Sequence, residues 1–297
     1  MSAILFQDVH KFYGDVHVVD NLSLEVPSGS IFGLLGPNGA GKTTSIRMML
    51  DIIKPDDGTI EILGRPHSTA VRDQIGYLPE ERGLFKKMTV KEAILFFAEI
   101  KGVSAKTARP RAEQLLQRLE LAEWMEKKIE ELSRGMQQKL QFICTVIHQP
   151  KLLILDEPFT GLDPVNTLLL KDVLLELNGA GTTVVFSTHL MEQAEKLCES
   201  ICLINKGQGV LSGTLAEVKS KFGRNRIKLS YDGDAAFLND PALVTSYDNY
   251  GQYVEIKPAT NVTSQMILRR AIDQVRVRHF EVADPSLNEI FISVVKE

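Results

Sequence analysis

Residues 36–43 read Gly-Pro-Asn-Gly-Ala-Gly-Lys-Thr, a glycine-rich segment that ends in a lysine and a threonine. The short apolar run Ile31–Leu35 precedes it, and apolar side chains recur at helical spacing over residues 43–51 behind it. The pattern GxxxxGK[ST] between a strand and a helix is that of a phosphate-binding loop. Glycines let backbone N–H groups surround phosphate oxygens without Cβ clashes, and the helix N-terminus adds the positive end of its dipole. The segment therefore predicts a site for a phosphorylated ligand.

Two residues at the end of this loop have separable roles towards a nucleoside triphosphate. The Lys42 ammonium is expected to reach the β- and γ-phosphates, which also makes Lys42 a candidate catalytic residue. The Thr43 hydroxyl is the expected ligand of a bound Mg²⁺ ion. The loop residues that we expect to contact the nucleotide are Gly36, Asn38, Gly39, Gly41, Lys42, Thr43 and Thr44.

A second apolar strand, Leu152–Leu155, ends in two adjacent carboxylates, Asp156 and Glu157. Asp156 is the expected Mg²⁺ partner in a site built on a phosphate-binding loop. Glu157 lies at the carboxyl edge of the strand, where a general base could orient an attacking water. An Asp-Glu pair alone is usually a solvated strand end, but together with the loop it indicates phosphoryl chemistry.

Apolar strands and helical segments alternate between residues 151 and 206, which indicates parallel βαβ units. A stretch that is helical throughout interrupts this alternation, and it begins with a capping box, Thr89-x-x-Glu92. We therefore expect a helical subdomain over about residues 88–150, inserted into the sheet-forming sequence.

The pattern changes near residue 222, where short strands with turns replace the βα alternation. Strands are predicted at 226–232, 243–247, 252–257 and 276–282, and helices at 263–274 and 286–295. The sequence thus predicts an α/β P-loop NTPase fold with a mostly parallel sheet over residues 1–222. A small α+β domain is predicted over residues 223–297.

The net charge and the lengths of the apolar runs limit the kinds of partner and location that we expect. The net charge of −4 over 297 residues argues against nucleic-acid binding, because proteins that bind the phosphate backbone are usually basic. The N-terminus lacks a basic segment followed by a long apolar stretch, and no apolar run is long enough to span a bilayer. We expect a cytoplasmic chain that acts at a membrane only from outside the lipid.

Five further segments resemble the motifs of ABC ATPases, in the order that this family has them. They are Tyr13 in KFYG, Pro79-Glu80 after IGYL, Leu132-Ser133-Arg134-Gly135-Met136, Gly161-Leu162-Asp163 and His189 after TTVVFST. They resemble, respectively, the aromatic residue that stacks on adenine, the Q-loop, the LSGGQ signature, the D-loop and the switch histidine. The spacing, the GLFKKMTV stretch and the C-terminal domain resemble the sodium-extruding, ABC-2 exporter branch of the family.

The resemblance implies an ATPase that uses ATP and Mg²⁺ and works as a head-to-tail dimer, either of two copies or with a close paralogue. Each ATP would lie between the P-loop of one subunit and Ser133 and Gly135 of the other, with Asp163 at the same interface. His189 would act in catalysis, and Tyr13 would stack on the base. The dimer would drive a multi-span membrane permease in a separate chain, peripheral on the inner face of the cell membrane.

Two positions depart from the family pattern. Glu80 stands where the Q-loop has glutamine, and a carboxylate there could ligate Mg²⁺. The alternative is that this loop mainly contacts the membrane partner and that its residue type matters less. In the signature, Arg134 and Met136 replace a glycine and a glutamine, whereas Ser133 and Gly135 remain.

Other interpretations stay open from sequence alone. A non-transport ABC-type ATPase acting on a soluble macromolecular partner shares the same motifs, although such proteins usually carry two tandem ATPase domains or a long coiled-coil insertion. A small-molecule kinase or GTPase explains neither the serine signature nor the downstream histidine. Taken singly, Tyr13 could be a core residue, His189 a structural residue and Ser133 a helix N-cap.

Overall fold

The computed structural model describes residues 2–66, 69–81, 83–222 and 226–296. The chain divides into two compact units, Met1–Thr214 and Leu215–Glu297. The division falls ahead of helix α8 (Leu215–Lys221), whereas the sequence analysis places a boundary after this helix, near residue 222. Residues 223–225, where the predicted second domain begins, lie outside the described residues.

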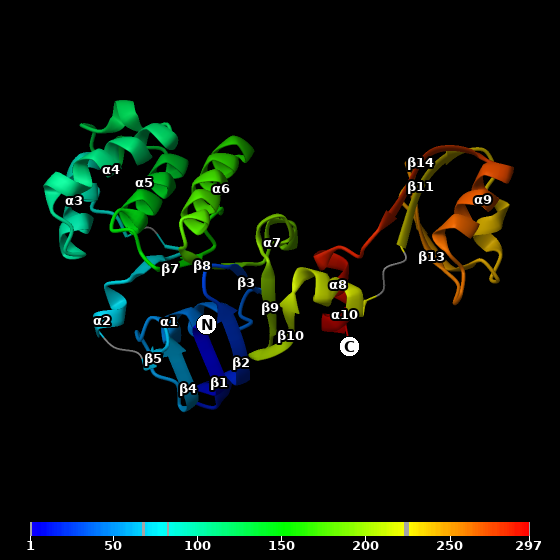
Figure 1. Ribbon diagram of the computed structural model, residues 1–297, viewed down its shortest axis with the longest axis horizontal. Helices are drawn as coiled ribbons and strands as arrows, with labels where there is room; N and C mark the ends of the chain where they lie inside the picture. Colours follow the sequence, from blue (N-terminus) through cyan, green and yellow to red (C-terminus); the bar gives the residue numbers. More distant parts are fainter. Residues whose placement is uncertain (1, 67–68, 82, 223–225, 297) are drawn as a thin grey trace. The chain divides into compact units, whose positions relative to one another are not determined.

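A six-stranded sheet forms the centre of the first unit (Figure 1). Its strands in spatial order are β10 (Gln208–Thr214), β9 (Ser200–Asn205), β3 (Ile31–Leu35), β8 (Thr183–Thr188), β7 (Leu152–Asp156) and β6 (Ile75–Leu78). Neighbouring strands from β9 to β6 run parallel, and only β10 pairs antiparallel, at the edge. Every residue of β3, β7 and β8 is buried, as expected for parallel strands covered on both faces. The predicted α/β fold with a mostly parallel sheet is confirmed.

A second, antiparallel sheet was not predicted as a separate layer. Its strands in order are β2 (Val16–Pro27), β1 (Ser2–Tyr13), β4 (Asp57–Ile62) and β5 (Arg65–Pro66). The alternation of apolar and polar residues that indicates strands breaks off between residues 9 and 22, so the sequence does not predict the continuous hairpin of β1 and β2. The hairpin continues through these residues by means of register shifts in the β1–β2 pairing.

The helical subdomain is inserted between β6 and β7 (Figure 1). It comprises α3 (Val90–Ile100), α4 (Ala105–Arg118), two 3₁₀ turns (Ala122–Trp124 and Ile129–Glu131) and α5 (Arg134–Val146). Helix α3 begins with the predicted capping box, in which Thr89 and Glu92 each accept from the other's backbone N–H. The other helices of this unit are α1 (Lys42–Met49), α2 (Thr69–Arg72), α6 (Pro164–Gly179) and α7 (Met191–Leu197).

The second unit contains a four-stranded antiparallel sheet with its own apolar core. The strands in order are β12 (Val244–Asn249), β13 (Val254–Pro258), β11 (Arg226–Asp232) and β14 (Arg276–Ala283). Helix α9 (Ser264–Gln274) and a 3₁₀ turn (Ala236–Asn239) contribute to that core, and α10 (Leu287–Lys296) ends the described chain. The elements match the predicted small α+β arrangement.

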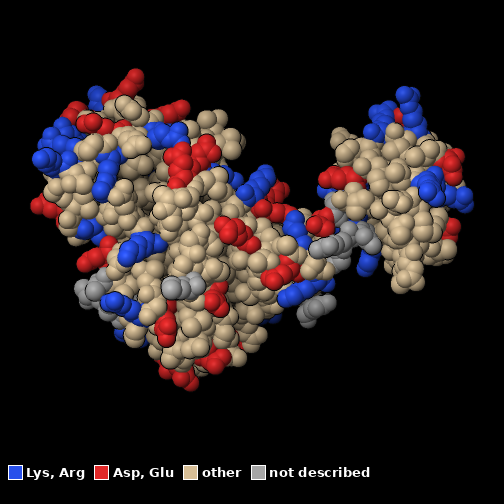
Figure 2. Space-filling view, viewed as in Figure 1, with Lys and Arg blue, Asp and Glu red and all other residues tan. Residues whose placement is uncertain are grey.

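Acidic and basic side chains are interspersed on the face of each unit that Figure 2 shows. On this face the net charge of −4 is therefore not gathered into one acidic patch. None of the helices within the described ranges combines the length and the apolar character that crossing a membrane requires.

Candidate functional site

The glycine-rich loop runs from the end of β3 to the start of α1, as the motif predicts. Gly36 and Gly41 adopt positive φ angles of 152° and 108°. A Cβ atom at Gly36 would overlap the carbonyl oxygen of Ile204 in β9, and one at Gly41 would lie 2.8 Å from the carbonyl oxygen of Val18 in β2. The loop therefore needs glycine at both positions, because neighbouring strands press against its backbone.

Lys42 is folded back over this loop. Its Nζ donates to the carbonyl oxygens of Gly36 and Pro37, at 2.8 and 3.0 Å, and the side chain is buried. Burial lowers the pKa of the Lys42 ammonium, and the nearby carboxylates of Glu157 and Asp156 oppose that shift. A ligand anion in this cavity would further favour the charged lysine.

Asp156 ends the central strand β7 and is almost fully buried, at 1% exposure. The Ser187 hydroxyl donates to its Oδ1. Its Oδ2 is also buried, and it has no hydrogen-bond partner among the described residues. A buried carboxylate oxygen without a partner is costly, so this atom fits a site that a cation completes.

Glu157 follows directly with a left-handed backbone, at φ 49°, and its carboxylate is held by the end of β8. The His189 N–H donates to Oε1 at 3.1 Å, and His189 Nδ1 lies 2.7 Å from the same oxygen. The Thr188 hydroxyl donates to Oε2 at 3.3 Å. The backbone and side chain of the β8–α7 connection thus orient a buried carboxylate next to Asp156.

These groups line one cavity of about 290 Å³. The lining residues that the sequence analysis names are Asn38, Gly39, Gly41, Lys42, Thr43, Thr44, Glu80, Asp156, Glu157 and His189. Val18 and Thr160 also line it and were not anticipated. Val18 is an ordinary apolar strand residue, so no sequence signal distinguishes it. Thr160 follows the carboxylates closely enough that proximity in sequence could have suggested it.

Five of the predicted site residues lie outside this lining. Gly36 contributes its carbonyl oxygen, which accepts a hydrogen bond from Lys42 Nζ. Tyr13 is about half exposed at the end of β1, with Lys11 Nζ 5.9 Å from its ring centroid. The remaining three residues, Ser133, Gly135 and Asp163, lie at the starts of two helices.

Ser133 is the N-cap of α5, and its hydroxyl accepts from the Met136 N–H at 3.3 Å. Asp163 is the N-cap of α6, and its carboxylate accepts from the Asn166 N–H at 2.9 Å. The hydrogen bonds from the Asn166 N–H and the Asn166 side-chain amide lower the pKa of the Asp163 carboxyl. Both side chains therefore stabilise the N-terminus of a helix, independently of any contact with a nucleotide.

Comparison with known proteins identifies the family of this chain. The family model "ABC transporter" matches residues 19–160, and the model "ATP-binding protein DrrA1-3-like, C-terminal domain" matches residues 213–295. The uncharacterised ABC transporter ATP-binding protein YhaQ of Bacillus subtilis (strain 168) is 42% identical over 287 residues, which cover 97% of this chain and 96% of that protein. The chain belongs to the family of ABC transporter ATP-binding proteins.

Other members of this family are similar over most of the chain. The Nod factor export ATP-binding protein I of Burkholderia orbicola (strain AU 1054) is 39% identical over 81% of this chain and 80% of its own length. A solved ATP-binding subunit of an ABC transporter superposes with a TM-score of 0.70 at 30% identity, covering 75% of this chain and 94% of that one. The solved CbiO1 of Clostridium perfringens gives a TM-score of 0.67 at 25% identity, covering 74% and 92%.

Membership of the family gives the chain its activity. It is an ATP-binding subunit of an ABC transporter, and it hydrolyses ATP to power transport. The resemblance stated from the ordered motifs is therefore confirmed, and the kinase and GTPase interpretations fall away.

The backbone of the phosphate-binding loop gives a direct test of its packing. We expect Gly36→Ala to destabilise the first unit by more than about 3 kcal/mol and to abolish ATP binding, since the added methyl overlaps a strand carbonyl. Gly29→Ala is the matched control, because Gly29 also has a positive φ, at 74°, but open space around its Cβ position. That control should cost about 1–3 kcal/mol from backbone strain alone and leave ATP binding intact. Urea unfolding and calorimetric ATP titration measure both, and equal losses for the two variants would contradict the packing argument.

Proposed function

We propose that this chain powers export as one of two subunits that close head-to-tail around two ATP molecules with Mg²⁺. The second subunit is another copy of this chain or a close paralogue, and both act on a multi-span permease in a separate chain. The proposal rests on the observation that some candidate residues line the cavity and others lie outside its lining. Lys42, Asp156 and Glu157 share one cavity, whereas Ser133 and Gly135 do not contribute to its lining within the described part of the chain.

Inside one subunit, the cavity supplies the groups that hydrolysis needs. Lys42 binds the β- and γ-phosphates, and Thr43 and Asp156 hold the metal ion, with the unpartnered Oδ2 of Asp156 as the ligand atom. Mg²⁺, when bound, neutralises charge on the phosphate oxygens. Glu157 orients and deprotonates the attacking water, and His189 positions the Glu157 carboxylate through the 2.7 Å contact.

Three further residues of the first unit are assigned by the same proposal. Glu80 lines the cavity, where it adds a third carboxylate near the metal. Tyr13 is exposed at the end of β1 and free to stack on the adenine ring. Asp163, exposed at the start of α6, contributes to the interface between the two subunits.

The second subunit completes the site. Ser133 accepts a backbone N–H in its own chain, but its hydroxyl proton is left to donate to a γ-phosphate across the interface. Gly135 has no side chain to cover the first turn of α5, and a Cβ added there would be in van der Waals contact with Leu162 Cδ2 at 3.7 Å. A phosphate can therefore approach the N-terminus of α5 closely, where the helix dipole favours an anion.

This head-to-tail arrangement predicts complementation between two inactive variants. Lys42→Ala removes the phosphate ligand on one face, and Ser133→Arg blocks the opposite face, so each homodimer should lose ATPase activity. At equal mixing about half of the dimers are mixed, and each mixed dimer contains one site in which both faces are wild type. About a quarter of all sites are therefore intact. ATPase activity that reappears on mixing supports the dimer. If the mixture stays as inactive as its components, the head-to-tail proposal is wrong.

A separate groove is suited to the permease. It encloses about 540 Å³ between β6, α3 and α5, and its lining is mainly apolar, with Tyr77, Leu84, Phe97, Ile100 and Cys144 among the residues. Burial lowers the pKa of His148, on the same groove, to about 4, so this side chain adds no charge at neutral pH. An exposed apolar hollow of this kind favours a short apolar segment of a partner protein.

The groove lies next to the nucleotide cavity through one loop. Pro79 and Gly83 line the groove, and Glu80 between them lines the nucleotide cavity. A movement of this loop on ATP binding or hydrolysis would therefore reach a docked permease segment directly. The position of this loop supports the interpretation that it mainly contacts the membrane partner. The same position is compatible with Glu80 as a ligand of the metal ion.

A charge placed in the groove tests the docking proposal. We expect Ile100→Glu, in a tagged Glu157→Gln background that holds the dimer closed, to lose the co-purifying permease while still binding ATP. Ile272→Glu is the control, since Ile272 is 62% exposed and Ile100 is 59% exposed. Mass spectrometry of detergent-solubilised native membranes identifies the partner. A permease retained equally by both variants would overturn docking in this groove.

The proposed direction of transport rests on the name of a related protein, and the proposed location follows from the permease. The Nod factor export protein is named for export, and we extend that direction, but not its substrate, to this chain. The chain is then peripheral on the inner face of the cell membrane, where the permease holds it. We further propose that residues 223–297 form an accessory domain that supports the assembly without taking part in the ATP chemistry, because its described residues contribute nothing to the cavity.

A further inference from the structure

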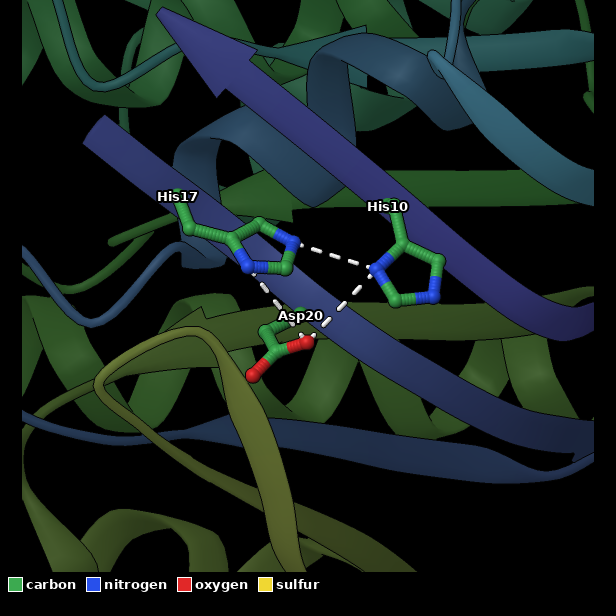
Figure 3. Close-up of side chains that lie close together, drawn as sticks. All are labelled: His10, His17 and Asp20. Atoms are coloured by element: carbon green, nitrogen blue, oxygen red, sulfur yellow. Dashed lines mark hydrogen bonds and ion pairs between the residues drawn. The ribbon is translucent and has the colours of Figure 1, made fainter. Parts of the chain in front are cut away.

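Three potential metal-binding side chains meet on the β1–β2 hairpin (Figure 3). His10 comes from β1, and His17 and Asp20 come from β2. His10 Nδ1 lies 3.1 Å from His17 Nε2 and 3.5 Å from Asp20 Oδ1, and His17 Nδ1 lies 3.5 Å from the same Asp20 oxygen. One nitrogen or oxygen atom from each residue lies within 4.8 Å of those from the others.

The hairpin's irregular register brings these residues together. In a regular strand His17 and Asp20, three residues apart, would point to opposite faces of the sheet. The pairing shifts on both sides of Lys11, from Phe12↔His17 to Lys11↔Val19 and then to Val9↔Leu22, so that β2 carries extra residues here. Such bulges re-aim side chains, and they place both residues on the side of His10.

Neighbouring groups hold the three side chains in position. The Phe12 ring stacks on His17 with a centroid separation of 4.0 Å. The Gln208 amide donates to Asp20 Oδ2 at 2.6 Å, which leaves Oδ1 towards the histidines. Partners such as Phe12 and Gln208 orient the ligands of a metal ion. The Asn21 N–H donates to His10 Nδ1 at 3.3 Å, and this long hydrogen bond has to give way when the single lone pair of that nitrogen binds an ion.

We propose that His10, His17 and Asp20 form a transition-metal site, with Zn²⁺ as the ion that fits it best. Two imidazoles and one carboxylate are a donor set that suits Zn²⁺ rather than Mg²⁺ or Ca²⁺, which prefer oxygen ligands. Bonds of about 2.0–2.2 Å in a tetrahedral site put ligand atoms roughly 3.3–3.6 Å apart. An imidazole binds the ion through one nitrogen only, and the 3.5 Å separations of His10 Nδ1 and His17 Nδ1 from Asp20 Oδ1 meet this range.

The site is accessible and lies close to the nucleotide cavity. The three side chains are 26–31% exposed, so an ion can enter from solvent, and a water can fill the fourth position. Val18, next to His17, lines the nucleotide cavity, and the Asp20 N–H donates to Gly207, whose N–H donates to Ala40 of the phosphate-binding loop. A bound ion ties the two strands of this hairpin together beside the ATP site. The inference is independent of the proposed head-to-tail dimer and its permease.

The experiment titrates Zn²⁺ into the chelator-treated, nucleotide-free full chain by calorimetry. The wild type should bind one ion at this site and melt at a higher temperature with Zn²⁺ than without. His17→Ala and Asp20→Asn should each weaken that binding at least about tenfold, since even the loss of a residue that merely orients a ligand costs 10- to 100-fold. Both should abolish the shift in melting temperature.

Two control variants test whether Zn²⁺ binding depends on the hairpin residues in particular. His279→Ala removes a histidine whose Nε2 lies 3.4 Å from a Glu281 oxygen, and it should leave the Zn²⁺ titration unchanged. His189→Ala removes the histidine of the ATP cavity and should leave the hairpin site intact. Metal-free circular dichroism verifies that each variant is folded, and His10→Ala replaces any that is not. A wild type that binds no Zn²⁺, or the same binding in the wild type and the hairpin variants, overturns the site.

Discussion

The buried carboxylate of Asp156, beside the buried ammonium of Lys42, is the interaction on which the functional core depends. Removing both charges from water is costly, and one oxygen of Asp156 keeps no partner among the described residues. Two strands that are not neighbours, β3 and β7, bring the groups together at the same edge of the parallel sheet, with β8 between them. The fold therefore maintains an incomplete charge arrangement that, in our proposal, a metal ion and phosphates complete.

In the proposed dimer, the ATPase chemistry is divided between two surfaces of the first unit. Lys42, Asp156 and Glu157 belong to the cavity, whereas Ser133 lies at the start of α5 outside its lining, so under the proposed head-to-tail dimer a single chain lacks a complete site. The loop around Glu80 joins the cavity to the apolar groove. In the proposed assembly, chemistry, dimer closure and permease contact depend on neighbouring segments of one unit, which would give hydrolysis a short route to the membrane partner.

Local signals made much of this predictable from sequence. The phosphate-binding loop combines glycines, a lysine and flanking elements in one short segment, and the Asp156-Glu157 pair ends an uninterrupted apolar strand. The contact between His189 and Glu157 depends on how β7 and β8 pair, and no local pattern encodes it. The approach of His10 to Asp20 depends on register shifts in a hairpin whose middle lacks alternation. Strand β10 was missed because its exposed edge position requires little apolar sequence.

The most direct test of the central claim is the melting temperature of Asp156→Asn, with and without ATP and Mg²⁺, beside Asp172→Asn on the exposed face of α6 as control. We expect Asp156→Asn to melt above the wild type without ligand, because it removes a buried charge that is only partly compensated, and to gain much less from ATP with Mg²⁺. The control should behave as the wild type does. An Asp156→Asn variant that melts below the wild type without ligand, yet gains as much from ATP with Mg²⁺, would contradict the claim that Asp156 awaits a metal ion.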